Sequence, residues 1–242
     1  MRITVWNENG HERFEEEIRA LYPEGMHGCI ANFYREAGHE VTTATLDMPE
    51  IGLPDELLDQ TDVLVWWSHG MINEVPDEKV KKICDRVIND GMGLIVLHSG
   101  HASKIFRKLM GARSGHLKWR VAYPPEIDDK EIVWVVDQSH PIAQGIDEKF
   151  ILEREEMYGE PTLIPAPDEL VFLSWFSGGE VFRSGCTYKR GRGKIFYFRP
   201  GHESCPTFYD KNVQRVLLNA AEWAYTPPAK PYKYGWSAPV VE

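Results

Sequence analysis

The chain has 242 residues, of which 43% are hydrophobic and 26% are charged, a composition typical of a folded globular domain and not of a disordered chain. Its 27 basic and 37 acidic side chains give a formal net charge of −10, which argues against binding to nucleic acid or to anionic membranes, since both need a basic surface. The four cysteines are scattered, and Met1 is followed at once by the strand-like RITVW, so we expect a cytoplasmic protein without disulfides, signal peptide or membrane span.

The first 111 residues alternate between strand and helix patterns. Short apolar runs predict strands at residues 3–7, 39–46, 62–67 and 94–97. The third of these is apolar almost throughout, which is typical of a parallel strand covered on both faces. Helical spacing predicts a helix that ends at Gly38, a short one after Pro54, and a third from Pro76 to Gly91. Such alternation indicates right-handed crossovers and a parallel sheet.

After Gly111 the pattern changes, because strands follow one another without helices between them. The predicted strands cover residues 133–136, 169–175, 180–189 and 194–198. We expect them to add antiparallel strands to one side of the sheet, with a hairpin turn at Gly178-Gly179. Thr207 is expected to cap a final helix.

These segments predict a single α/β domain over residues 1–242. Its parts are a parallel core at 1–111, a strand-rich elaboration at 112–199, a C-terminal helix at 207–225 and an extended tail at 226–242. The tail is rich in proline and aromatic residues, so we expect it to pack on this subunit or on a neighbour, which favours a homo-oligomer.

Histidines gather where the predicted strands end. Ligands of open parallel sheets bind beyond the carboxyl ends of the strands, so side chains at those ends should share one edge of the sheet. Five of the nine histidines have such positions: His11, His69, His98, His101 and His202. A single loop histidine is more often a surface or capping residue, and it is the repetition that indicates a site.

The stretch GLIVLHSGHAS at residues 93–103 reads as a strand, a tight turn and a helix, which is the geometry of a nucleophile elbow. A serine hydrolase needs the pattern G-x-S-x-G, and the glycines around Ser99 do not follow it. Ser99 acting as a nucleophile with His202 is therefore the least favoured hypothesis. The pair His98 and His101 is by itself a weak metal signal, because it lacks the HExxH frame and cysteine partners.

Several segments, in order along most of the chain, resemble the ThuA-like (trehalose-utilisation) family. They are VWNENGHE, DVLVWWSHG, GLIVLHSGHAS, SHPIAQGI, EEMYGE and GRGKIFYFRPGHESCPTFYDKNVQRVLLNAAEWA. HSGHA is also similar to the elbow of class I glutamine amidotransferases, with Gly100 and His101 matching and His98 in the place of the catalytic cysteine. The resemblance implies a flavodoxin-like or class I glutamine amidotransferase-like three-layer sandwich and a role in sugar catabolism. The missing thiol excludes glutamine hydrolysis through a thioester.

We therefore expect an enzyme of carbohydrate metabolism that acts on a sugar or an oxidised disaccharide by acid–base chemistry, for which imidazoles are suited near neutral pH. The candidate catalytic residues are His98, His101, His202, Glu156 and Tyr158. The candidate substrate-binding residues are Asn7, His11, His69, Ser99 and Glu203.

Two further expectations concern this site. A divalent metal such as zinc on His98, His101 or His202, together with Glu156, would polarise a sugar oxygen. The strand tryptophans Trp6, Trp66 and Trp67 are candidates for stacking on a pyranose, although tryptophans in strands more often belong to a core. The alternative function is a non-catalytic sugar-binding or regulatory protein on the same fold.

Overall fold

One large sheet organises the molecule. The computed structural model describes residues 1–120, 129–227 and 235–238, and within them nine strands pair in the order β2-β1-β3-β4-β11-β10-β9-β6-β7. They are β1 (Arg2–Asn7), β2 (Glu40–Thr45), β3 (Val63–Trp67), β4 (Gly93–Leu97), β6 (Asp129–Val135), β7 (Lys149–Glu155), β9 (Glu169–Phe176), β10 (Val181–Arg190) and β11 (Gly193–Phe198). A separate two-stranded sheet joins β5 (Lys118–Arg120) to β8 (Met157–Gly159).

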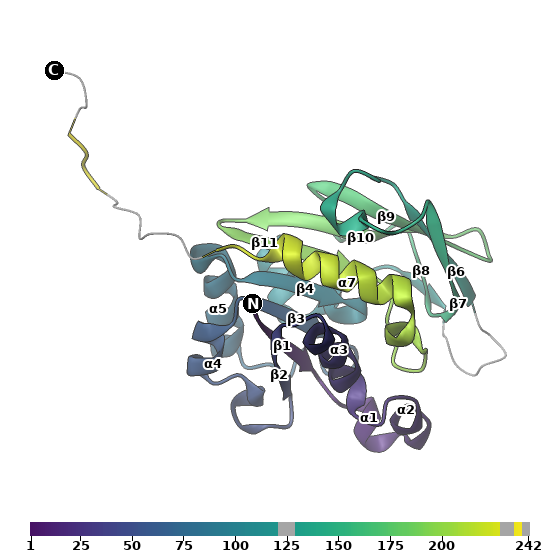
Figure 1. Ribbon diagram of the computed structural model, residues 1–242, viewed down its shortest axis with the longest axis horizontal. Coiled ribbons are helices and arrows are strands. Elements are labelled where there is room, and N and C mark those ends of the chain that lie inside the picture. The colour runs from purple at the N-terminus through teal and green to yellow at the C-terminus, as the bar shows by residue number, and fades with distance from the viewer. Residues whose placement is uncertain (121–128, 228–234, 239–242) are drawn as a thin grey trace.

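The large sheet has a parallel half and an antiparallel half. β2, β1, β3, β4 and β11 run parallel, in the order of a flavodoxin-like doubly wound sheet. β10, β9, β6 and β7 continue the sheet as antiparallel pairs, and Figure 1 shows them extending one side of the parallel half. The predicted fold class, a parallel α/β sheet with antiparallel strands added on one side, is confirmed.

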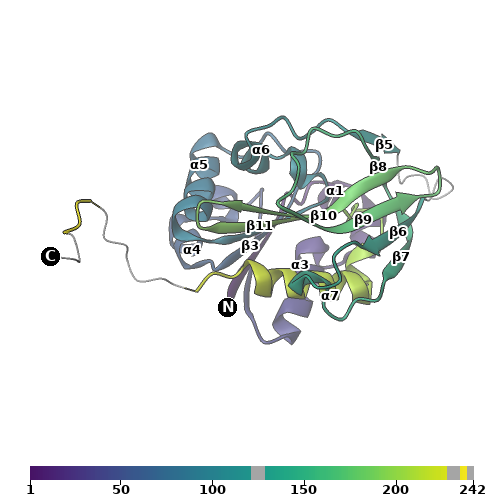
Figure 2. The ribbon, with the colours of Figure 1, turned by 90° about the horizontal axis from the view of Figure 1, so that it is seen from above.

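Helices cover both faces of the parallel half. The α-helices of the described residues are α1 (His11–Phe14), α2 (Glu16–Leu21), α3 (Gly25–Glu36), α4 (Asp55–Gln60), α5 (Asp77–Asp85), α6 (Lys104–Met110) and α7 (Lys211–Ala224). Figure 2 shows α3 and α7 on one side of the sheet and α5 and α6 on the other. The domain is therefore a three-layer sandwich, as predicted.

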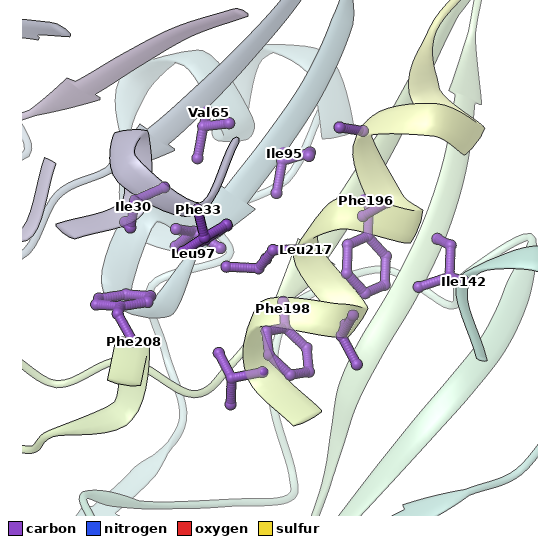
Figure 3. Packing of buried hydrophobic residues seen from close by; sticks show 14 of the residues in the cluster. Ile30, Phe33, Val65, Ile95, Leu97, Ile142, Phe196, Phe198, Phe208 and Leu217 are labelled. Carbon is purple, nitrogen blue, oxygen red and sulfur yellow. The ribbon is translucent and has the colours of Figure 1, made fainter. Parts of the chain in front are cut away.

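Each face of the sheet has its own buried core, because successive strand residues point to opposite faces. In β3, Val65 and Trp67 belong to the core under α3 and α7, whereas Leu64 and Trp66 belong to the core under α5 and α6. Figure 3 shows the first of these cores, where side chains of α3 and α7 meet those of β3, β4 and β11. With both faces covered, the open positions of the sheet are at the ends of its strands.

The strand tryptophans belong to these cores and offer no surface to a ligand. Trp6 and Trp66 stack with ring centroids 3.7 Å apart, and the Trp6 indole N–H donates to the Ile51 carbonyl at 2.9 Å. Trp67 lies on the opposite face and donates to the Gly201 carbonyl at 2.8 Å. The expectation that these three tryptophans stack on a pyranose is wrong, because strands covered on both faces bury both sets of side chains.

The final helix begins later than the sequence predicted. Asp210 is the N-cap of α7, and its side chain accepts hydrogen bonds from the backbone N–H groups of Asn212 and Val213. Thr207 instead begins a 3₁₀ turn, and its hydroxyl donates to the buried carboxylate of Glu155. The prediction of Thr207 as the helix cap is wrong. Threonine and aspartate both favour N-cap positions, and here the threonine hydroxyl is bound to the Glu155 carboxylate, so Asp210 caps the helix instead.

The C-terminal tail is described only in part. Trp236 is 88% exposed, while residues 228–234 and 239–242 lie outside the described residues. Packing of the tail on this subunit or a neighbour therefore stays a prediction. Within the described ranges, no helix combines the length and the apolar character that crossing a bilayer requires.

Asp210→Ala should lower the free energy of unfolding by about 1 kcal/mol, because it removes the acceptor for two amides at the start of α7. Urea unfolding followed by circular dichroism measures the change. Asp210→Ser restores a capping oxygen and should recover most of the loss. Equal stability of Asp210→Ala and the unmodified protein would contradict the capping role.

Candidate functional site

Strands β1, β3, β4 and β11 are neighbours, so the loops that follow them meet at one edge of the sheet. Three imidazoles and one carboxylate converge there: the ligand atoms of His69, His98, His202 and Glu203 all lie within 4.8 Å of one another. The three ring centroids are 5.4, 5.2 and 5.3 Å apart. We call these four residues the histidine cluster. It lies where the strand-end pattern predicted a site.

His98 is presented by a strained turn. Its φ is +50°, in the left-handed region that costs a non-glycine residue on the order of 1–3 kcal/mol and recurs at functional sites. The turn is also tight at Gly100, where a Cβ would lie 2.9 Å from Cγ1 of Val96. Nδ1 of His98 donates to the Arg199 carbonyl at 3.2 Å, which leaves the lone pair on Nε2. Burial lowers the pKa of His98 to about 3, so this imidazole is neutral.

His69 and Glu203 form an ion pair, with Nδ1 and Oε1 2.9 Å apart. Burial acts to lower the pKa of His69, but its hydrogen bond to Glu203 and the charges of Glu203, Glu156 and Glu8 raise that pKa to about 9. Burial acts to raise the pKa of Glu203, but the hydrogen bond from His69 and the neighbouring imidazoles hold it well below its usual range. The pair is therefore ionised at neutral pH.

His202 is neutral and carries its proton on Nε2. The backbone N–H of Ser204 donates to Nδ1 at 3.2 Å, and Nε2 lies 3.7 Å from Oε2 of Glu203. Burial lowers the pKa of His202 to about 4, against the opposing charge of Glu203. For Nε2 to ligate a cation, the ring proton must move to Nδ1. Nδ1 then no longer accepts from the Ser204 backbone N–H and instead donates to the Ser204 hydroxyl, 2.8 Å away.

Glu156, which joins β7 to β8, and Tyr158 of β8 lie against the cluster. Oε2 of Glu156 lies 3.1 Å from Nε2 of His98 and has no hydrogen-bond donor within the described part of the chain. The Tyr158 hydroxyl lies 3.3 Å from the same Nε2 and 2.5 Å from the hydroxyl of Ser99. Burial raises the pKa of both Glu156 and Tyr158, which favours their protonated forms.

His101 lies beside the histidine cluster and is not part of it. Its Nδ1 donates to the Ser114 carbonyl at 2.7 Å, and its ring contacts Tyr158. Burial lowers the pKa of His101 to about 3, so it too is neutral. The predicted metal set contained His101, whereas the group that converges has His69 and Glu203 in its place.

The two predicted binding residues that follow β1 have different positions. Asn7 is buried, and its amide donates to Glu12 at 2.6 Å, so it supports the turn after β1 and does not face the cluster. His11 lies at the rim, with Nε2 3.4 Å from Oε1 of Glu203 and Nδ1 2.6 Å from Glu15. Of these two residues, only His11 has access to a ligand.

Sequence reasoning missed Glu8. Its buried carboxylate accepts hydrogen bonds from the backbone N–H groups of His69, Gly70 and Met71 at 2.7, 2.7 and 3.1 Å. These bonds hold the loop that carries His69. The signal was present, since Glu8 directly follows the first predicted strand, where the strand-end pattern selects residues.

A buried ion-pair network lies behind the cluster, and sequence reasoning missed it as well. The guanidinium of Arg199, which is 0% exposed, pairs with the carboxylates of Glu131 and Glu155, both also buried. Glu155 further accepts from the backbone N–H of Gly201 at 2.9 Å. The network therefore joins β6, β7 and β11 to the loop that carries His202 and Glu203.

The histidine cluster has the chemistry of a divalent-cation site. Imidazole nitrogens and carboxylate oxygens are the ligands of zinc, and His98 and His202 are neutral, as ligation requires. His69 is charged at neutral pH, so it becomes a ligand only when a cation displaces the proton of its Nε2. Its Nδ1 is held by Glu203, the arrangement that orients ligating histidines. Oε2 of Glu203 is buried and lacks a hydrogen-bond partner among the described residues. The residues present fit a bound cation.

Comparisons with known proteins agree with the fold. A family model described as ThuA, trehalose utilisation, matches residues 2–224. A ThuA-like protein from Parabacteroides merdae has a TM-score of 0.68 at 16% identity, over 96% of this chain and 92% of its own. A cytoplasmic protein from Salmonella typhimurium has a TM-score of 0.63 at 14% identity, over 93% of this chain and 100% of its own. No curated protein sequence matches this chain.

Arg199→Met should lower the free energy of unfolding by about 3–5 kcal/mol, because it leaves Glu131 and Glu155 buried without a cation. Urea or thermal unfolding measures the loss. The matched control is Lys81→Met, which removes the exposed ion pair with Asp85 and should cost less than about 0.5 kcal/mol. Similar losses in the two variants would show that the buried network does not stabilise the fold.

Proposed function

Because this chain belongs to the ThuA (trehalose-utilisation) family, we propose that it is an enzyme of carbohydrate metabolism that acts on a sugar or an oxidised disaccharide. The proposed reaction is acid–base chemistry by histidines and a carboxylate, assisted by a divalent cation such as zinc. The histidine cluster supports this function, because its ligand atoms lie within 4.8 Å of one another and three of its four residues are buried, with His69 half-buried. Burying so many titratable groups is unfavourable unless they are paired or ligate a metal.

The proposed ligands are His69, His98, His202 and Glu203. When bound, a divalent cation polarises a carbonyl or hydroxyl oxygen and lowers the pKa of bound water. The chain prepares the ligands in advance, because the Arg199 carbonyl fixes the tautomer of His98 and Glu203 orients His69.

Glu156 is the proposed general acid–base residue. Its Oε2 faces the lone pair of His98 Nε2 at 3.1 Å, a contact that is favourable only when a proton or a cation lies between the two atoms. Burial raises the pKa of Glu156 towards the range in which a carboxyl group exchanges protons at neutral pH. Tyr158 and Ser99, hydrogen-bonded to each other beside this contact, can position a sugar hydroxyl.

Metal analysis tests the proposed cation. Protein purified without a histidine tag should contain about one equivalent of a divalent metal, and His98→Ala and His202→Ala should each lose most of it. His39→Ala, a change outside the cluster, is the control and should retain the metal. Less than about a tenth of an equivalent in the unmodified protein, after incubation with zinc and removal of the excess, would exclude the metal-assisted form of the reaction.

Turnover tests the acid–base role. Trehalose and trehalose oxidised to a ketone at one ring carbon are incubated with the protein, and products are followed by NMR. Glu156→Gln should slow the reaction by about a hundredfold or more, because the amide cannot transfer the proton. Sugar that binds without any product forming would instead favour the non-catalytic, regulatory alternative.

A further inference from the structure

A small cavity opens beside the histidine cluster, between the turn after β4 and the β5–β8 ribbon. Its volume is about 200 Å³, and its walls include His69 of the cluster and Glu156 beside it, together with Ser99, His101, Tyr158 and Trp119. A ligand in this cavity therefore lies directly against the groups to which we assign the chemistry. The role assigned to this cavity below rests on the proposed function, because it concerns which part of the sugar substrate the cavity binds.

Trp119 stands at the mouth of the cavity. It lies opposite Tyr158 in the antiparallel β5–β8 pair, so the two side chains share one face of the ribbon. Tyr158 is 3% exposed and Trp119 is 61% exposed, which places the tyrosine in the wall and the indole at the rim. An exposed indole next to a polar cavity is a surface on which the apolar face of a ring can stack.

The inner wall of the cavity offers polar groups of defined direction. Nδ1 of His101 donates to the Ser114 carbonyl, so Nε2 is a hydrogen-bond acceptor, and within the described part of the chain nothing donates to it. The hydroxyls of Ser99 and Tyr158 lie 2.5 Å apart in the same wall. A sugar ring has the matching chemistry, with an apolar C–H face and an edge of hydroxyl groups.

We propose that this cavity is the subsite for one pyranose ring of the substrate. The ring stacks on Trp119, and one of its hydroxyl groups donates a hydrogen bond to Nε2 of His101. The volume of about 200 Å³ is below the roughly 300–1,000 Å³ of sites that hold drug-sized ligands. One ring of a disaccharide therefore occupies the cavity, and the other extends past Trp119 into solvent. Specificity for the first ring then depends on Trp119 and His101.

The test measures binding of trehalose, the same disaccharide oxidised at one ring carbon, and methyl α-D-glucopyranoside by titration calorimetry. Trp119→Ala should weaken binding about five- to tenfold, and Trp119→Phe should retain most of the affinity, since a smaller aromatic face remains. Trp175→Ala, at an indole 40% exposed that does not line the cavity, is the matched control and should bind as the unmodified protein does. The monosaccharide should bind within a few-fold of the disaccharide of the same oxidation state.

His101→Leu tests the acceptor, with His101→Gln as the variant that restores one. Leucine should weaken binding and glutamine should recover part of it, while thermal unfolding confirms that both variants are folded. Unchanged affinity in both Trp119→Ala and His101→Leu, with binding and turnover intact, would overturn the subsite and leave the proposed function standing. Absence of both binding and turnover of all three sugars would overturn the proposed function and the subsite together.

Discussion

The arrangement of the site depends on one buried cation, the guanidinium of Arg199. It lies at the junction between the parallel and antiparallel halves of the sheet and neutralises carboxylates that come from β6 and β7. The same residue donates to the Glu156 carbonyl at 2.5 Å and, through its own carbonyl, fixes the tautomer of His98. An interaction that stabilises the fold thereby also positions two of the groups to which the chemistry is assigned.

The three imidazoles of the histidine cluster show how partners, and not residue type, determine charge. His98 and His202 are buried and His69 is partly so, which disfavours the charged form of each imidazole. Among the three, and within the residues that the structure describes, only His69 is hydrogen-bonded to a carboxylate, so its pKa rises to about 9, while those of His98 and His202 fall to about 3 and 4. One edge of the sheet therefore holds a charged donor and two neutral imidazoles within a few ångströms.

The sequence was sufficient to predict that histidines meet at one edge of the sheet, but not which of them converge on one point. Neighbouring parallel strands place their carboxyl ends at one edge, so the meeting of His69, His98 and His202 followed from strand order. The position of His101 did not, because it depends on the path of the turn after β4 and on a bond to Ser114.

The buried carboxylates of Glu131 and Glu155 were beyond sequence reasoning for a related reason. They come from β6 and β7, whose pairing contains a register irregularity that an alternating apolar pattern does not reveal. In the same way, Trp119 could be assigned to the site only once β5 was seen to pair with β8.

The left-handed backbone at His98 also limits how this position can change. Glycine adopts such a conformation without strain, and asparagine, aspartate and histidine adopt it more readily than other residues, whereas β-branched side chains are strongly disfavoured. The backbone conformation therefore restricts which residues can replace His98, whatever the reactivity of their side chains. Residues that tolerate the left-handed backbone all place their side chains at the same point above the sheet, so the reactive group can change while the surrounding fold does not.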